Sequence, residues 1–380
     1  MKILFILENY IPHIGGVEVV FKNLSERLAK QGHEVDIITH QLKGTKREET
    51  INNVRIHRIP CFNSRYWFTF LAISKAINLA KKADIIHTTT YNGALPARIA
   101  AIFSKKPCII TVHEVLGKNW KTFEGMNILS SKLHEFLEKR IMSLKFDCFV
   151  SVSKSTERNV LELNIPKAKS AVVYNGVDYD FFNPKKYNGK KIRKNFNLEK
   201  NFVYFFYGRP GVSKGFEYLL NAVPAISERI PNSKLFAIVS KDKAYIKRYN
   251  YMKKLIKELN IEDKVILRDP VPHKELPNYI KAADCVVVPS LTEGFGFTAA
   301  ESCAMNIPVV ASNTGSLPEV VSGKYVLVEP KNSLAIAEGV EKIYKKKVKN
   351  AAKKIFLWKD NFGGYLNVYK KLLGQQIKNQ

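Results

Sequence analysis

The chain has 380 residues, of which 46% are hydrophobic and 25% charged, an ordinary composition for a globular protein of about two or three domains. This length and composition exclude an intrinsically disordered chain, a collagen and a small secreted scaffold held together by disulfides. The formal net charge of +27 indicates attraction to polyanions (nucleic acid, anionic membrane or a phosphorylated substrate), although solvated surface lysines alone would also produce it.

In the first half of the chain, short apolar runs alternate with amphipathic stretches. The runs are continuous and rich in β-branched residues, which predicts strands of a parallel sheet covered on both faces. They are Ile3–Leu7, Val35–Thr39, Asp84–Thr90, Cys108–His113 and Cys148–Ser153. The intervening stretches predict the helices Val17–Lys30, Trp67–Ala80, Ile128–Ser143 and Lys154–Leu163. This βαβ order predicts a doubly wound, Rossmann-like α/β domain over residues 1–180.

Gly, Asn, Pro and Lys then cluster at Asn175–Asn195, which predicts a linker. A second alternation predicts another doubly wound domain over residues 190–350, followed by a basic helical tail over residues 351–380. Its strands are predicted at Phe202–Tyr207, Leu235–Val239, Val265–Leu267, Cys285–Pro289, Val309–Ala311 and Tyr325–Val328. Its helices are predicted at Lys214–Ile230, Tyr245–Asn260, Glu275–Ala282, Thr298–Met305 and Leu334–Lys346. Two such sheets facing each other would form a cleft, because open α/β sheets bind ligands beyond the carboxyl ends of their strands.

The cysteines and the start of the chain indicate a cytoplasmic protein. Five cysteines are scattered without any Cys-x-x-Cys pair, so neither a disulfide framework nor a zinc site is expected. The opening MKILFIL is broken by Glu8 and is too short for the core of a signal peptide. No segment approaches the ~20 apolar residues of a transmembrane helix, so any membrane contact would be peripheral.

Two candidate binding positions lie in the first half. Gly15 and Gly16 precede the predicted helix, where backbone N–H groups and the helix dipole can hold an anion, although a tight turn would use the same glycines. Their spacing is not Gly-x-Gly-x-x-Gly and no Walker motif occurs, which removes the main support for nicotinamide-binding and P-loop functions. His113 ends a predicted strand and would face the cleft, whereas a lone histidine can also be structural.

A third candidate is the loop Tyr207–Gly215 (YGRPGVSKG), which follows a strand and opens a helix. Arg209 and Lys214 both project from this turn. Two cations beside a helix N-terminus suit a diphosphate, although exposed basic residues are common in a basic protein.

The densest candidate is the segment Pro289–Glu319, with Glu293 at a strand-to-helix turn and Glu301 inside the helix. Their spacing is just over two helical turns, so both carboxylates could face the same end of a site and accept sugar hydroxyls. A pair of glutamates on a helix is otherwise a solvated face, but the small apolar neighbours of Glu301 favour burial. Thr314 and Gly315 open a second glycine loop before the next helix, which is another cradle for an anion.

At these residues the sequence resembles the retaining glycosyltransferases of family 4, which have the GT-B fold. EGFGFTAAE carries the family's E-x(7)-E motif, and GRPGVSKGFEYLLNA, AADCVVVPSLTEGFGF, PVVASNTGSLPEVV and GGVEVVFKNLSERLAKQGHEVDIIT agree with it in order. VYNGVDYDFFNP resembles the inter-domain segment, and LWKDNFGGYLNVYKKLL resembles the closing helix that packs back on the N-terminal domain. E-x(7)-E alone is a weak signal, whereas the ordered set covers nearly the whole chain.

The resemblance implies that the N-terminal domain binds the acceptor and the C-terminal domain binds the nucleotide-sugar donor. Arg209 and Lys214 would hold the donor diphosphate, Glu301 the ribose diol, and His113 would lie near the anomeric carbon. Glu293 and the backbone of Gly294, Phe295, Gly296 and Phe297 would contact the sugar, and Gly15, Gly16, Thr314 and Gly315 would approach the phosphates. No metal or other cofactor is expected, because family enzymes work without one and no D-x-D tripeptide occurs here.

Two residues depart from the family pattern: Asn306 and Ser316 stand where the family often has glycine. Asn306 can keep a turn in the left-handed region, whereas Ser316 changes how closely the backbone can approach the donor.

The resemblance implies a hexosyltransferase that uses a UDP-sugar or GDP-mannose, with the acceptor set by the loops Gln41–Asn53, Arg58–Trp67 and Val115–Asn127. Aromatic residues of the second loop, together with basic neighbours, could seat the protein on anionic membrane at its inner face, unless they form helix core. The acceptor class expected is therefore a lipid-linked or cell-surface glycan, as in lipopolysaccharide assembly. A GT-B nucleotide-sugar epimerase or a non-catalytic sugar-nucleotide-binding protein is the alternative, and no nucleic-acid-binding module is recognised.

Overall fold

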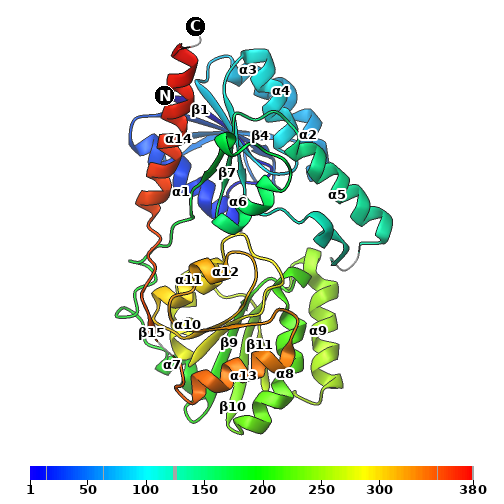
Figure 1. Ribbon diagram of the computed structural model, residues 1–380, viewed down its shortest axis with the longest axis vertical. Helices are drawn as coiled ribbons and strands as arrows, with labels where there is room; N and C mark the ends of the chain where they lie inside the picture. The colour runs from blue at the N-terminus through cyan, green and yellow to red at the C-terminus, as the bar shows by residue number, and fades with distance from the viewer. Residues whose placement is uncertain (14, 63, 123–125, 349, 379–380) are drawn as a thin grey trace. The chain divides into compact units, whose positions relative to one another are not determined.

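The computed structural model describes residues 1–13, 15–62, 64–122, 126–348 and 350–378, which form two compact units (Figure 1). Unit 1 holds the described residues of 1–121, 126–176 and 356–378, and unit 2 holds those of 177–355. Each unit is built on a mainly parallel sheet that helices cover, so the predicted α/β class with two Rossmann-like sheets is confirmed.

The described part of unit 1 contains an eight-stranded sheet in the order β3-β4-β2-β1-β5-β6-β7-β8, parallel except for the β3–β4 pair. Its strands are β1 (Lys2–Ile6), β2 (Glu34–His40), β3 (Glu48–Ile51), β4 (Val54–Ile59), β5 (Ile85–Thr89), β6 (Cys108–Val112), β7 (Cys148–Ser151) and β8 (Ser170–Val172). Side chains of β1 alternate between two cores: Ile3 and Phe5 belong to one, and Leu4 and Ile6 to the other. Because both faces are covered, the strand is apolar throughout, which is the pattern that predicts it.

The two cores of unit 1 are covered by different helices (Figure 1). α1 (Gly16–Lys30) and α14 (Trp358–Lys378) contribute to the core that contains Ile3. The other core is covered by α2 (Arg65–Leu71), α3 (Ile73–Ala80), α4 (Ala94–Ser104), α5 (Ile128–Met142) and α6 (Lys154–Leu161). The single helix predicted at Trp67–Ala80 is therefore wrong in detail, because α2 and α3 meet at the buried Ala72.

Parts of the predicted acceptor loops are regular structure instead. Gln41–Asn53 contains β3, which pairs antiparallel with β4 through a turn where Asn52 and Asn53 have φ of 50° and 65°. Such a turn matches the twist of a hairpin and suits Asn. Arg58–Trp67 begins inside β4 and ends inside α2, and Val115–Asn127 contains the 3₁₀ helix η1 (Gly117–Thr122).

The C-terminal helix is tied to the unit 1 sheet by polar contacts as well as by packing. The Tyr369 hydroxyl lies 2.8 Å from His87 Nδ1, and His87 Nε2 lies 2.8 Å from Thr111 Oγ1. The Thr111 hydroxyl is also 3.0 Å from that of Tyr365. All these side chains are buried, and buried polar groups are stable only when they are paired in this way.

The described part of unit 2 contains a seven-stranded sheet in the order β11-β10-β9-β12-β13-β14-β15, parallel except for the β14–β15 pair. Its strands are β9 (Phe202–Gly208), β10 (Ser233–Val239), β11 (Val265–Arg268), β12 (Cys285–Val288), β13 (Val309–Ser312), β14 (Gly323–Val328) and β15 (Asn350–Ala351). Its helices are α7 (Lys190–Asn195), α8 (Phe216–Arg229), α9 (Ile246–Glu258), α10 (Leu276–Ala282), α11 (Phe297–Ala304), α12 (Leu317–Val320) and α13 (Ser333–Tyr344).

The stretch predicted as a linker is partly packed structure. α7 lies within it, and Arg193 of α7 forms an ion pair with Asp284 at 2.6 Å and donates to the Ala282 carbonyl at 2.8 Å. Gly189 precedes α7 and lies so close to Ala282 that a Cβ there would overlap its backbone. The prediction fails here because composition does not show which basic residue has a partner far along the chain.

Candidate functional site

The candidate donor residues of unit 2 lie beyond the carboxyl ends of β9, β12 and β13, on the loops that follow these strands and, for Phe297 and Glu301, in helix α11. The loop after β9 ends at Gly215, whose φ of 61° is left-handed and where a Cβ would overlap the Pro289 carbonyl after β12. The Leu291 N–H donates to the Ser213 carbonyl at 2.7 Å and joins the same two loops. Lys214 is therefore held between them, at the end of a short 3₁₀ turn.

The backbone around Glu293 is fixed by the loop after β13. Gly315 has a φ of 54°, and a Cβ there would overlap the Glu293 carbonyl. That carbonyl accepts from the Ser316 N–H at 3.1 Å and from the Ser316 hydroxyl at 3.2 Å, and the Thr314 hydroxyl donates to the Leu291 carbonyl at 3.1 Å. Ser316 is fully buried, so the departure from glycine at this position adds a hydrogen bond that holds Glu293.

Lys214 and Glu293 form a close ion pair, although 79 residues separate them in the sequence. The Lys214 Nζ atom lies 3.0 Å from Glu293 Oε1 and 2.7 Å from Oε2, and both side chains are mostly buried. An ammonium has three N–H donors, so a further acceptor can bind without breaking this pair. The two opposite charges thus lie side by side.

Glu293 is not part of the helix that carries Glu301. α11 begins at Phe297, after Gly296 with a φ of 91°, so the expectation that eight residues would span two helical turns does not apply. Gly294 and Phe295 belong to the turn between the two glutamates. The Asn306 that follows α11 adopts a φ of 58°, the left-handed conformation expected for it.

Glu301 is mostly buried and is paired with Tyr207, which begins the candidate loop Tyr207–Gly215 but was given no role in the sequence analysis. The Tyr207 hydroxyl, at the end of β9, lies 2.9 Å from Glu301 Oε2 and 3.2 Å from the Thr298 carbonyl. Burial raises the pKa of Glu301 to about 7, and the hydrogen bond from Tyr207 offsets only part of this effect. Burial also raises the pKa of Tyr207 well above its ordinary value. A carboxyl group with this pKa changes its ionisation within the physiological range.

Arg209 differs from Lys214 in being exposed. Its Nη1 atom lies 3.3 Å from the Tyr245 hydroxyl, and its guanidinium lies 5.9 Å from the centre of the Tyr245 ring. Tyr245 follows β10, so a fourth loop, in addition to those after β9, β12 and β13, orients this cation. No sequence motif pointed to Tyr245, because an aromatic residue in a basic loop has many roles.

Gly15, Gly16 and His113 belong to unit 1. Gly15 is the N-cap of α1. A Cβ at Gly15 would lie 2.5 Å from Glu18 Oε2, which shows that the carboxylate of Glu18, in the first turn of α1, lies against the N-terminus of the helix. Glu18 also pairs with His13 at 3.1 Å.

His113 follows β6, and burial lowers its pKa to about 4, against a smaller opposing effect of Glu18. Its Nε2 atom is buried without a hydrogen-bond partner among the described residues. The imidazole is therefore neutral near pH 7, with one ring nitrogen available.

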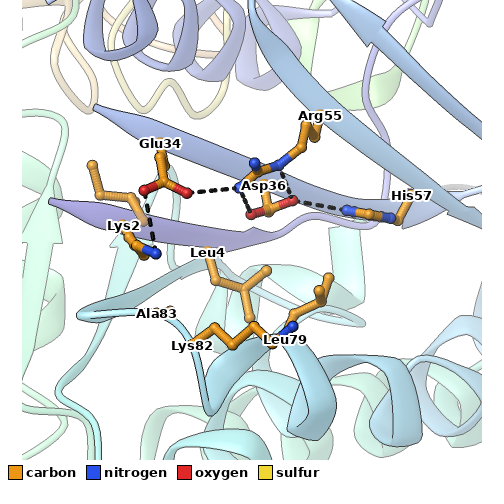
Figure 2. A pocket seen from close by; sticks show the side chains of 10 residues that line it. Lys2, Leu4, Glu34, Asp36, Arg55, His57, Leu79, Lys82 and Ala83 are labelled. Atoms are coloured by element: carbon orange, nitrogen blue, oxygen red, sulfur yellow. Dashed lines mark hydrogen bonds and ion pairs between the residues drawn. The ribbon is translucent and has the colours of Figure 1, made fainter. Parts of the chain in front are cut away.

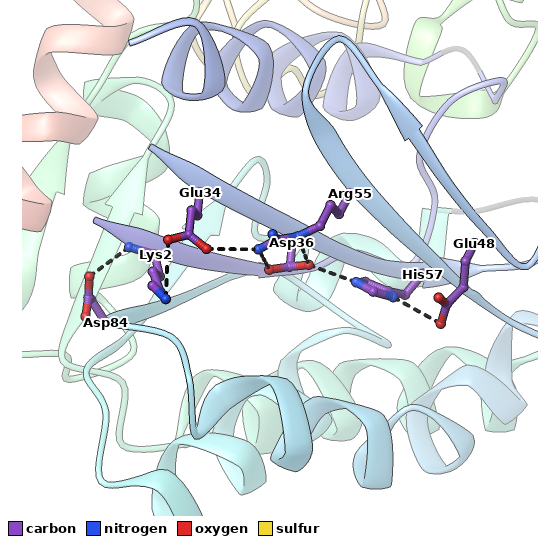
Figure 3. A network of polar contacts seen from close by, with 7 residues as sticks. All are labelled: Lys2, Glu34, Asp36, Glu48, Arg55, His57 and Asp84. Carbon is purple, nitrogen blue, oxygen red and sulfur yellow. Dashed lines mark hydrogen bonds and ion pairs between the residues drawn. The ribbon is translucent and has the colours of Figure 1, made fainter. Parts of the chain in front are cut away.

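A separate polar cluster in unit 1 surrounds a cavity of about 380 Å³ (Figure 2). Asp36 accepts from Arg55 at 2.9 and 2.7 Å and lies 2.8 Å from His57 (Figure 3). Burial alone would raise the pKa of Asp36, but these hydrogen bonds outweigh it and hold the pKa at about 2. Lys2 and Glu34, which begin β1 and β2, continue the network. The cluster lies at the amino ends of the strands, so we interpret it as ion pairing that joins β1, β2 and β4.

The chain matches two families of known proteins, "Glycosyltransferase Family 4" over residues 14–181 and "Glycosyl transferases group 1" over residues 188–355. It is 30% identical to an uncharacterized glycosyltransferase of Methanocaldococcus jannaschii, over 97% of this chain and 98% of that protein. It is 26% identical to the UDP-Gal:alpha-D-GlcNAc-diphosphoundecaprenol alpha-1,3-galactosyltransferase of Escherichia coli, over 80% of this chain and 77% of that protein.

Among solved structures it is similar to the sucrose-phosphate synthase of Thermosynechococcus elongatus, with a TM-score of 0.75 and 22% identity over 99% of this chain and 97% of that one. At this identity the likeness shows the fold alone, which is GT-B. No helix in the described ranges is both long and apolar enough to cross a membrane.

Proposed function

Since the chain belongs to glycosyltransferase family 4, whose members are retaining hexosyltransferases that use nucleotide-sugar donors, we propose a division of labour between its domains. Residues 190–350 bind the donor, residues 1–180 bind the acceptor, and the C-terminal segment 351–380 completes the acceptor domain. The observation that carries this proposal is the Lys214–Glu293 pair, which three loops hold at the carboxyl ends of neighbouring strands of unit 2.

The donor diphosphate binds at Lys214 and Arg209. Lys214 keeps two N–H bonds to Glu293 and donates the third to a phosphate oxygen, while the exposed Arg209 adds a second positive charge. Thr314 and Gly315 lie on the loop that fixes Glu293 and place backbone groups near the phosphates. The Thr314 hydroxyl is already bonded to Leu291, so its contribution is structural.

The sugar and ribose bind at the two glutamates. The Glu301 carboxylate accepts hydrogen bonds from the hydroxyls of the ribose diol, and the Tyr207 hydroxyl orients the carboxylate by donating a hydrogen bond to it. Glu293 and the turn Gly294–Phe297 contact the hexose. The ionised form of Glu301 is the better acceptor, so we expect donor binding to weaken as pH falls through about 7.

The reaction is transfer with retention through a transition state that resembles an oxocarbenium ion. As the bond between the anomeric carbon and the phosphate oxygen breaks, negative charge grows on the departing nucleotide diphosphate. Lys214 and Arg209 stabilise that charge, which is the main electrostatic contribution of the protein. The acceptor hydroxyl attacks on the face that the diphosphate leaves and gives its proton to the leaving phosphate, so no carboxylate nucleophile of the protein is needed.

Unit 1 supplies Gly15, Gly16 and His113. By the family's pattern, we expect the glycines, at the start of α1, to approach the donor phosphates and His113, which follows β6, to approach the anomeric carbon. Because its pKa is about 4, His113 acts there as a neutral hydrogen-bonding group and adds no positive charge.

The acceptor is a hydroxyl of a lipid-linked or cell-surface glycan precursor, and the enzyme works in the cytoplasm at the inner face of the membrane. Support comes from the E. coli relative, whose name gives a UDP-sugar donor and a diphosphoundecaprenol acceptor. The structure adds that Tyr66, Trp67 and Phe70 of α2 are exposed, whereas Phe68 alone of these α2 aromatics enters the core. The donor is a UDP-sugar or GDP-mannose.

A panel of nucleotide sugars tests this proposal. The protein is incubated with each donor, with and without membrane lipid extract, and the release of UDP, GDP, ADP or CMP is measured. Release from one donor, increased by the extract and with the sugar recovered on lipid, is the expected result. An altered sugar still attached to its nucleotide would instead support an epimerase, and no release from any donor would contradict the catalytic proposal.

A further inference from the structure

The α5 helix presents an apolar face to solvent. Its exposed large side chains are Ile128, Leu129, Leu133, Phe136 and Leu137, with Leu129 78% exposed and Ile128 74%. At about 100° per residue, these side chains and the exposed basic ones fall in one half of the helix circumference. The opposite half contains the buried Ser131, Glu138 and Met142. The large apolar side chains of α5 are thus turned away from the core and lie among the exposed basic side chains of the same half.

The same half of α5 carries positive charge and no exposed acid. All residues of α5 are described, and its exposed charged side chains are Lys132, Lys139 and Arg140. The Arg140 guanidinium lies 5.0 Å from the centre of the Phe136 ring, so cation and aromatic share one surface. Glu135 is mostly buried and pairs with Lys139 at 2.9 Å.

The α2 helix repeats this composition and covers the same core as α5 (Figure 1). Its exposed residues are Arg65, Tyr66, Trp67, Phe70 and Leu71, again without an acid. Arg65 lies 5.4 Å from the Tyr66 ring centre and pairs inward with Glu8 at 3.3 Å.

We propose that the exposed faces of α5 and α2 form a docking surface by which unit 1 binds an anionic lipid bilayer. This proposal rests on the proposed function, because it gives the lipid-linked acceptor a membrane-bound enzyme. Aliphatic and aromatic side chains enter the boundary between headgroups and acyl chains, and the flanking cations bind anionic headgroups. A second copy of the chain is disfavoured as occupant, because both surfaces would be positive in a protein of net charge +27. Leu and Ile side chains do not suit nucleic acid, which is bound by aromatic stacking and cations.

The inner side of α5 connects this docking surface to the loop after β6. The Glu138 carboxylate accepts from the Leu116 N–H at 3.0 Å, the Gly117 N–H at 2.7 Å and the Trp120 Nε1 atom at 3.2 Å. This loop follows His113 at the carboxyl end of the sheet. A helix that rests on the membrane would therefore hold, through one carboxylate, the loop expected to select the acceptor.

Co-sedimentation with vesicles tests the docking surface independently of catalysis. The full chain is mixed with vesicles of phosphatidylglycerol and phosphatidylcholine, or of phosphatidylcholine alone, at low and high salt. We expect binding to the anionic vesicles that weakens with salt. Leu129→Glu should weaken it at least about tenfold, and the pair Lys132→Gln and Arg140→Gln should do the same. The matched control is Leu334→Glu, an exposed leucine of α13 in unit 2, which should leave binding unchanged.

A second measurement, the release of nucleotide from the donor in the absence of acceptor, distinguishes a failure of the docking surface from a failure of the proposed function. Leu129 lies outside the residues proposed to bind the donor, so Leu129→Glu should release nucleotide at the wild-type rate. Equal binding by Leu129→Glu and Leu334→Glu would overturn the docking surface even if donor turnover is normal. Absence of vesicle binding would overturn it as well. A concentration-dependent dimer that Leu129→Glu abolishes would replace the bilayer with a second copy of the chain.

Discussion

Replacing Glu301 by glutamine should change the stability of unit 2 and donor binding in opposite directions. Burial raises the pKa of this carboxyl group from 4.5 to about 7. At a pH between these two pKa values, the Glu301 carboxyl group is ionised in the unfolded chain and still protonated in the folded chain. The unfolded state then binds fewer protons, so stability falls as pH rises, with no penalty below about pH 4.5 and the full penalty above about pH 7.

The size of the penalty follows from the two pKa values. At about 1.4 kcal/mol per pKa unit, a rise from 4.5 to about 7 costs at most about 3 kcal/mol at pH 8. Glutamine has the same shape and no charge, so the variant avoids this cost. The hydrogen bond from Tyr207 is already included in the pKa of about 7, so it is not subtracted again. Glu301→Gln should therefore stabilise unit 2 by about 3 kcal/mol at pH 8 and by only about 1 kcal/mol at pH 5.

Urea unfolding at pH 5 and pH 8 measures this difference. It is followed by hydrogen exchange of the amides of β9 and β12, because Trp67, Trp120 and Trp358 all lie in unit 1 and do not report on unit 2. Glu338→Gln, at an exposed position of α13, is the matched control; it keeps Glu301 and should lose stability between pH 5 and pH 8 as the wild type does. The donor KM of Glu301→Gln should rise, since the ribose loses its carboxylate. If wild type and Glu301→Gln lose stability equally between pH 5 and pH 8, the argument from burial is refuted.

Three other perturbations address the same loops. Lys214→Ala should lower transfer by about 10²–10³-fold with the circular dichroism spectrum unchanged, because the leaving diphosphate loses the partly buried cation that stabilises it. Near-normal turnover would exclude this role. Transfer should continue in EDTA, measured as product formed with and without the chelator, whereas a strict requirement for a divalent metal would contradict charge stabilisation by Lys214 and Arg209 alone. Gly215→Ala should destabilise unit 2 by about 1–3 kcal/mol in urea unfolding, because φ is 61° and the new Cβ would overlap the Pro289 carbonyl, while Gly374→Ala, at an open helical position, should not.

The fold could be predicted where both faces of a strand are buried, because burial then imposes a continuous apolar run. β1 and β12 are such strands. β3 and β4 were not predicted, because an edge hairpin carries polar side chains such as Arg55 and His57. The break between α2 and α3 was missed for a different reason: Ala72 favours a helix locally, and only the packing around it ends one.

The candidate site could be predicted only as far as local sequence defines it. Glycine loops next to strand ends indicate where an anion can bind, and the turns at Gly215, Gly296 and Gly315 have left-handed backbones. The pairing of Lys214 with Glu293 could not be predicted, because it depends on how β9 and β12 lie in the sheet. The pairing of Glu301 with Tyr207 was also missed, since Glu301 lies on α11 and Tyr207 on β9, 94 residues apart in the sequence. The roles of these residues in binding the donor stay predictions.

Unit 1 is built from both ends of the chain, and this has a consequence for how the protein is made. The hydroxyl of Tyr369 bonds His87 across 282 residues, so this contact cannot form until all of unit 2, which lies between them in the sequence, has been synthesised. Until then the core around Phe5 and His87 lacks the helix that covers it. The nascent unit 1 therefore exposes apolar surface while the whole of unit 2 is translated. Chaperones would meet the protein at this stage, and a stop codon placed before α14 would release a chain that contains all of unit 2 but lacks a helix of the unit 1 core.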